Sequence, residues 1–104
     1  MALYHSLIKY KQERRILSFD LISDRKAKVR LLNARSLTIY ISDYYIVGVA
    51  EVVEAVAEPR ADYMVYNNWD MIASAALEEA RRQNIEIHKF GAFAYRLDEL
   101  NLVR

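Results

Sequence analysis

Three short stretches rich in β-branched and aromatic residues occur in the second half of the chain, and each is followed by apolar residues at helical spacing. The strands are predicted at Ser36–Ile41, Ala61–Tyr66 and Ile85–His88. The helices are predicted from Ser42 or Asp43 to about Ala57, at Met71–Gln83 and at Phe90–Leu100. Strands that alternate with helices in this way favour right-handed crossovers and a parallel sheet covered by helices.

The helix that ends near Ala57 carries two kinds of residue at helical spacing. Its expected buried side holds four apolar residues: Ile46, Val49, Val53 and Val56. Its other side holds three carboxylates: Glu51, Glu54 and Glu58. Such a row can line up on a metal ion, but a solvated face is more common, and we expect a solvated face here. Pro59 ends the helix, because proline disfavours helical geometry at the residue before it.

The first half of the chain has a weaker pattern. Leu3, Leu7 and Tyr10 recur at helical spacing and predict a short basic helix. Alternating apolar residues predict strands at Arg15–Ile22 and Lys28–Leu32, and a helical structure for residues 16–32 is the alternative. The complete order is then α-β-β-β-α-β-α-β-α. It predicts one small α/β domain of three layers over residues 1–104, with a mixed sheet whose second half is parallel.

The composition excludes several kinds of chemistry. The 104 residues are 54% hydrophobic and include no cysteine, which excludes disulfides, thiolate metal sites and cysteine nucleophiles. There is no Gly-rich phosphate-binding motif, so we expect no cofactor, and no metal site is predicted. The apolar runs are too short for a signal peptide or a membrane span, so no membrane partner is expected. A chain without cysteine fits a cytoplasmic location.

Charge is distributed unevenly along the chain. Residues 1–35 hold nine Lys/Arg against three Asp/Glu, whereas residues 36–104 hold six against eleven, so a net charge of +1 conceals a basic and an acidic segment. The basic segment predicts contacts with the phosphates of DNA or RNA. The residues expected to make them are Arg14, Arg15, Arg25, Lys26, Lys28 and Arg30. Alternatively, the basic segment pairs with the acidic segment of another copy in a homodimer.

A second candidate site lies where the predicted strand Ala61–Tyr66 ends. Ligands usually bind at the carboxyl edge of a parallel sheet, and polar and aromatic residues cluster at this edge. They predict a pocket or a contact surface made by Tyr63, Tyr66, Asn67, Asn68 and Trp69. The alternative is that Trp69 simply covers the core.

The stretch Ala61–Leu100 resembles the Mrr-type group of restriction-endonuclease-like domains, which belong to the PD-(D/E)xK superfamily. In that group an Ala-Asp-x-x-Val strand precedes an alanine-rich helix, an Ile-x-Ile strand and a short closing helix. Here Ala61-Asp62-Tyr63-Met64-Val65 is followed by a helix with four alanines and then by Ile85-Glu86-Ile87. The resemblance covers about forty residues and implies a nuclease-like fold.

The metal site of that family is incomplete in this sequence. The family places an Asp on one strand and Glu-x-Lys on the next, where they hold Mg²⁺ and orient a water. The strand that should carry Glu-x-Lys is Ser36–Ile41, and it contains neither residue. Asp20 or Asp24 can stand for the aspartate, but nothing completes the pair. The resemblance therefore implies a non-catalytic, nucleic-acid-associated protein rather than an enzyme.

Two nuclease alternatives remain open at this point. A metal-dependent nuclease could use residues that the family pattern does not align. Nuclease domains of the PIN type also end in strand–helix–strand–helix, and their clustered acids would be represented here by Asp43, Asp62 and Asp70, which form a partial set.

Overall fold

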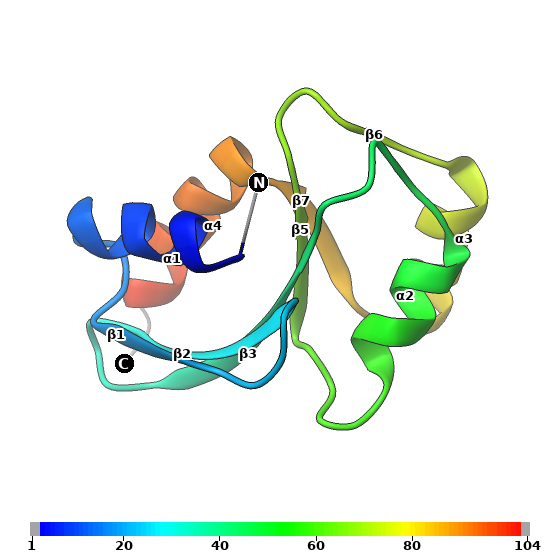
Figure 1. Ribbon diagram of the computed structural model, residues 1–104. Coiled ribbons are helices and arrows are strands. Elements are labelled where there is room, and N and C mark those ends of the chain that lie inside the picture. The colour runs from blue at the N-terminus through cyan, green and yellow to red at the C-terminus, as the bar shows by residue number, and fades with distance from the viewer. Residues whose placement is uncertain (1–2, 103–104) are drawn as a thin grey trace.

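The sheet at the centre of the protein has five strands in the order β1-β2-β3-β5-β7, as seen in a computed structural model that describes residues 3–102 (Figure 1). Its strands are β1 (Ser18–Leu21), β2 (Lys26–Arg30), β3 (Ser36–Ser42), β5 (Tyr63–Tyr66) and β7 (Glu86–Lys89). The pairs β1–β2 and β2–β3 are antiparallel, and β3–β5 and β5–β7 are parallel. The predicted mixed sheet with a parallel second half is confirmed.

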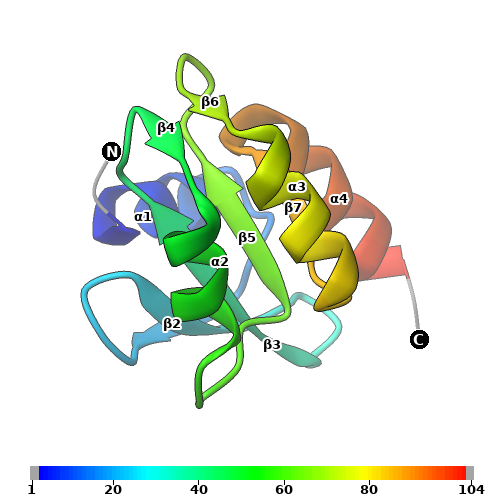
Figure 2. The same cartoon turned by 90° about the vertical axis from the view of Figure 1, so that its right-hand side faces the viewer.

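Two pairs of helices cover the sheet, which gives the three predicted layers. Helices α1 (Leu3–Gln12) and α4 (Phe90–Leu102) lie on one face (Figure 1). Helices α2 (Val49–Val56) and α3 (Ser74–Arg82) lie side by side on the other, over the parallel strands (Figure 2). The predicted element order is confirmed for the described residues, and residues 18–30 form two strands rather than the alternative helix.

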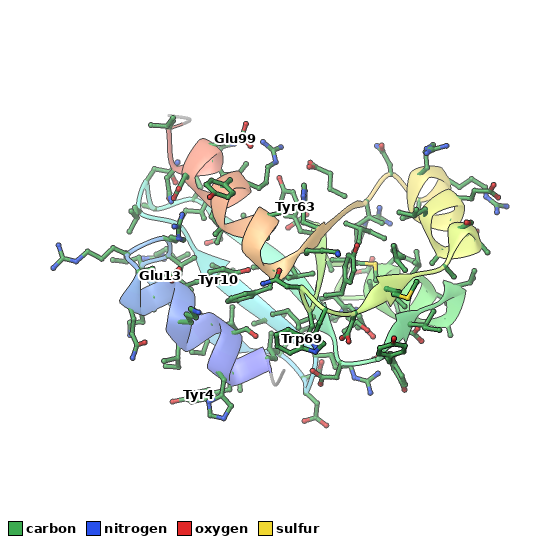
Figure 3. All side chains as sticks on the ribbon, turned by 90° about the horizontal axis from the view of Figure 1, so that it is seen from above. Tyr4, Tyr10, Glu13, Tyr63, Trp69 and Glu99 are labelled. Atoms are coloured by element: carbon green, nitrogen blue, oxygen red, sulfur yellow. The ribbon has the colours of Figure 1, made fainter. Side chains whose placement is uncertain are left out.

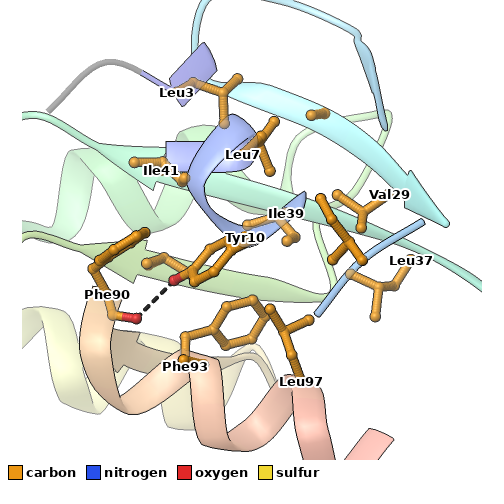
Figure 4. Packing of buried hydrophobic residues seen from close by; sticks show 14 of the residues in the cluster. Leu3, Leu7, Tyr10, Val29, Leu37, Ile39, Ile41, Phe90, Phe93 and Leu97 are labelled. Atoms are coloured by element: carbon orange, nitrogen blue, oxygen red, sulfur yellow. Dashed lines mark hydrogen bonds between the residues drawn. The ribbon is translucent and has the colours of Figure 1, made fainter. Parts of the chain in front are cut away.

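Alternate residues of the strands face the two helical layers, and each layer contributes a core. Val29 and Ile39 point towards α1 and α4, where they meet Leu7 and Phe93 (Figure 4), and Ala27 belongs to the same cluster. The opposite face buries a second cluster beneath α2 and α3: Tyr40, Val47, Val52, Ala55, Ala61, Met64, Ala76, Ala80 and Ile85. The period-two alternation of strand side chains explains this division.

The structure corrects the starts of two predicted helices. The segment Ile46–Val47 is a short strand, β4, that pairs in parallel with β6 (Met71–Ile72). Consequently α2 begins at Val49 instead of Ser42 or Asp43, and α3 begins at Ser74 instead of Met71. The two apolar segments lie close only after the chain has folded, so their pairing has no local signal.

The buried side of α2 also differs from the prediction. Val52 and Ala55 are buried, whereas Val53 is 53% exposed and Val49 38%. The predicted solvated face was wrong for Glu51, which is buried and accepts a hydrogen bond from the backbone N–H of Gly48 at 2.6 Å. Val56, the fourth predicted residue, is partly buried and packs against the core as expected. Because α2 begins at Val49, Ile46 does not belong to the helix, and the apolar pattern that included Ile46 gave the wrong orientation.

No helix within residues 3–102 is both long enough and apolar enough to cross a membrane.

Candidate nucleic-acid interface

One half of the sheet has a face that the described helices leave uncovered. On the side of α2 and α3, these helices lie over the parallel strands, and β1 and β2 extend beyond them (Figure 1). Strand register places six polar residues on this uncovered area, which we call the open sheet face: Ser18, Asp20, Lys28, Arg30, Ser36 and Thr38. All are exposed except Thr38, which is partly buried.

Lys28 and Arg30 are the two cations of the open sheet face. Arg30 lies between Ser18 and Ser36 on the neighbouring strands, so a guanidinium is flanked by two hydroxyl groups. Lys28 lies between Asp20 and Thr38. Within the described part of the chain, neither cation forms an ion pair or a side-chain hydrogen bond. Both are therefore available to a ligand.

Lys26 shares their strand but is buried. Only 6% of its surface is exposed, and its ammonium donates hydrogen bonds to the carbonyl oxygens of Ala57 at 2.6 Å and Pro59 at 3.0 Å. Burial lowers the pKa of Lys26, although the nearby Glu54 and Glu58 oppose this effect. This predicted phosphate contact fastens β2 to the end of α2 instead.

Arg25 is also engaged within the protein. Its guanidinium lies 4.7 Å from the ring centroid of Tyr44 and forms an ion pair with Glu54 at 3.4 Å. A hydrogen bond to the Tyr44 hydroxyl raises the pKa of Arg25. The side chain borders a polar groove with Ser23, Asp24, Asp43 and Glu54, so a nucleic acid would have to compete with acidic neighbours for it.

Arg15 and Arg14 complete the predicted set. Arg15 bonds Asp98 at 2.5 Å, Glu13 at 3.1 Å and the carbonyl oxygen of Ala94 at 3.1 Å. Arg14 is exposed in the turn after α1, with a left-handed backbone φ of 59°, and lies outside the open sheet face. Of the six predicted cations, the structure thus brings Lys28 and Arg30 together on an accessible surface and commits three others to internal contacts.

The predicted pocket residues after β5 are separated by the fold. Tyr63 packs against Phe93, with 5.4 Å between the ring centroids. Tyr66 packs against the second core cluster on the opposite face of the sheet. Asn67 is buried and donates to the Asp70 carboxylate at 2.8 Å. These three residues therefore shape the fold and do not share one surface.

Asn68 and Trp69 do border a groove of about 390 Å³. Trp69 is 68% exposed, so it does not form the lid over the core that was the alternative (Figure 3). The other walls come from α1 and α4 and include Lys9 and Tyr95, which sequence reasoning missed. Nothing in the sequence indicates which helix faces Trp69, so these walls had no sequence signal, and only the structure shows that Tyr95 is 72% exposed beside the groove.

The candidate acids do not form a metal cluster. Asp62 accepts a hydrogen bond from the Thr38 backbone N–H at 2.8 Å, and Asp70 accepts one from Asn67. Asp20 lies on β1, and Asp24 lies in the turn that follows it. No group of three His, Asp or Glu side chains in residues 3–102 is placed to hold a metal ion.

Comparisons with protein-family models, curated proteins and solved structures gave no match to this chain.

Proposed function

We propose that this protein binds nucleic acid through the open sheet face and does not cleave it. The observation that carries the proposal is the position of Lys28 and Arg30, two exposed cations without internal partners on a surface that the described helices leave uncovered. A localised cationic surface is the feature that phosphate binding requires.

The chemistry around these cations is suited to phosphates. Side chains two residues apart on a strand point the same way and are separated by about 7 Å, so Lys28 and Arg30 can reach different phosphates. The hydroxyl groups of Ser18 and Ser36 flank Arg30 and can donate further hydrogen bonds to phosphate oxygens. Such contacts position a nucleic acid without reading its bases.

The non-catalytic part of the proposal rests on β3. In the restriction-endonuclease-like proteins that the sequence resembles, the corresponding strand would carry Glu-x-Lys. Here the strand reads Ser-Leu-Thr-Ile-Tyr-Ile-Ser from Ser36 to Ser42. It therefore offers neither the carboxylate nor the lysine that would hold Mg²⁺ and orient a water.

Fluorescence anisotropy with labelled single- and double-stranded DNA and RNA tests the binding. For two phosphate contacts, the logarithm of the association constant should fall with the logarithm of salt concentration with a slope of about −2 on duplex DNA. The double variant Lys28→Glu/Arg30→Glu should remove most of the affinity and flatten the slope. Lys89→Glu, an exposed cation on the opposite edge strand, is the matched control and should retain the slope.

Asp20 provides a test in the opposite direction. Its carboxylate lies across from Lys28 and repels a phosphate there, so Asp20→Asn should increase affinity at low salt. Absence of binding at low salt, or equal losses in Lys89→Glu and the double variant, would contradict the proposal. Cleavage of the same substrates with Mg²⁺ or Mn²⁺, abolished by Asp20→Ala or Asp24→Ala, would overturn its non-catalytic part.

A further inference from the structure

Exposed apolar side chains gather on the outer side of α2 and the β4–β6 pair. We call this surface the apolar face and define it by five residues: Tyr45, Ile46, Val49, Val53 and Met71. Each is between 38% and 67% exposed. Ile46 and Met71 are register partners in the β4–β6 pair, and α2 and α3 run side by side below this pair (Figure 2). Folding thus joins two apolar segments into one surface.

Helix α2 shows that this surface is unusual for a solvated face. Val52 and Ala55 already supply its contacts with the core, yet Val49 and Val53 are exposed on its other side. Ala50 is exposed there as well. A helix that is apolar on both sides is normally covered on both sides. Contiguous apolar patches of this kind mark interaction surfaces.

We propose that a second copy of this chain covers the apolar face and forms a two-fold symmetric dimer. The first argument is charge complementarity. The far end of α2 is followed by the exposed Glu58, and the far end of α3 carries the exposed Arg81. Glu54 and Arg82, which lie nearby, already pair with Arg25 and Glu79. The surface therefore has a carboxylate at one corner and a guanidinium at the other, beside a shared apolar centre.

A two-fold axis that runs between α2 and α3 and parallel to them brings these corners together. Both helices start at the β4–β6 pair and run in the same direction (Figure 2). Rotation about this axis places α2 of one copy over α3 of the other, so Glu58 meets Arg81 of the second copy. The same contact forms twice, as an isologous interface requires. A surface that complements itself in this way fits a second copy better than an unrelated partner.

The size of the apolar face is the second argument. Five large side chains that are about half exposed offer roughly 500 Å² on each copy, so two copies together bury roughly 1,000 Å², the area that a specific interface needs at minimum. The proposal goes beyond nucleic-acid binding and does not depend on it.

Sedimentation equilibrium of the complete chain tests the dimer from low micromolar to several hundred micromolar concentration. The mass should rise from that of one chain to that of two. Val53→Glu places a charge at the centre of the contact and should raise the dissociation constant at least tenfold. Leu17→Glu is the matched control, because Leu17 is exposed to a similar degree, 51% against 53% for Val53, and lies just before β1, away from the apolar face. This variant should leave the dissociation constant of the dimer unchanged.

A charge exchange tests the orientation. Glu58→Arg and Arg81→Glu should each weaken the dimer, and the double variant should restore it. Ile46→Glu serves as the second central variant if circular dichroism shows that Val53→Glu is unfolded, because Ile46 is 54% exposed on the same face. A single-chain mass at every concentration, or a dimer that both central variants leave intact, overturns the proposal. Equal weakening by Leu17→Glu also overturns it.

Discussion

Tyr10 joins the two helices of one layer through a single hydroxyl group. The hydroxyl donates a hydrogen bond to the carbonyl oxygen of Phe90 at 2.7 Å, and the two rings stack with centroids 4.5 Å apart (Figure 4). Burial raises the pKa of Tyr10, because a phenolate away from water is disfavoured. The residue therefore contributes to stability as a hydrogen-bond donor and only in its neutral form.

We expect Tyr10→Phe to reduce the free energy of unfolding by about 1–2 kcal/mol at pH 7, because a buried carbonyl loses its donor. Above pH 10 the unfolded chain ionises Tyr10 while the folded chain keeps its proton. The wild-type protein then loses up to about 1.4 kcal/mol per pH unit through this group. The difference between wild type and Tyr10→Phe should therefore shrink as the pH rises.

Urea denaturation at pH 7 and above pH 10 measures this difference. Tyr4→Phe, an exposed tyrosine on the same helix, is the control and should cost little at either pH. A constant difference between wild type and Tyr10→Phe across the pH range would show that the phenol does not resist ionisation in the folded protein.

Lys26 illustrates why single residues can mislead. In sequence it is one of a group of cations near a turn and was predicted to bind phosphate. In the structure it occupies the first position of β2, and its ammonium satisfies the carbonyls of Ala57 and Pro59. A lysine that binds no ligand can thus serve as the hydrogen-bond donor for backbone carbonyls that would otherwise be buried without one.

At the scale of elements, α2 contributes apolar side chains both to the core and to the apolar face. The helix begins after Gly48, where Glu51 binds the first backbone N–H, and this start sets which residues point inwards. Val52 is fully buried, and its neighbour Val53 is 53% exposed. The same residue type thus occurs on both sides of one short helix.

This pair of valines gives a direct test of the orientation of α2. Val52→Ala should destabilise the protein by about 2 kcal/mol, because it leaves a cavity in the core. Val53→Ala should change the free energy of unfolding by less than about 0.5 kcal/mol when measured at low protein concentration. Chemical denaturation of both variants measures the two values, and a larger loss for Val53→Ala would place the helix in the orientation that the sequence pattern suggested.

At the scale of the whole molecule, the two oppositely charged segments interact with each other. Arg15 pairs with Asp98, and Arg25 pairs with Glu54. Part of the charge asymmetry along the chain is therefore satisfied internally, and only part is left for a partner. Lys28 and Arg30 on the open sheet face belong to the remainder.

The open sheet face and the apolar face are separate surfaces, so we expect their functions to be separable. Val53→Glu should retain the salt-dependent affinity of a single chain for nucleic acid. The variant Lys28→Glu/Arg30→Glu should retain the dissociation constant of the dimer. Anisotropy and sedimentation on both variants check this, and parallel losses in both assays would show that binding and association are coupled.

The sequence alone determined the order of the helices and of the five strands of the central sheet, the α/β class and the parallel second half of the sheet. These features follow from local periods of apolar residues and from the handedness of crossovers, which act within one element or between neighbours. Asn84 shows the same local control, since it follows the end of α3 with a left-handed φ of 60°, a conformation that asparagine adopts readily.

Only the tertiary structure decided which cations are accessible, which face of α2 is buried and where β4 meets β6. Each depends on contacts between segments far apart in the chain, such as Lys26 with Pro59 or Ile46 with Met71. Local patterns cannot encode these distances. The candidate sites therefore changed more than the fold, because a binding surface is defined by what the remainder of the chain leaves uncovered.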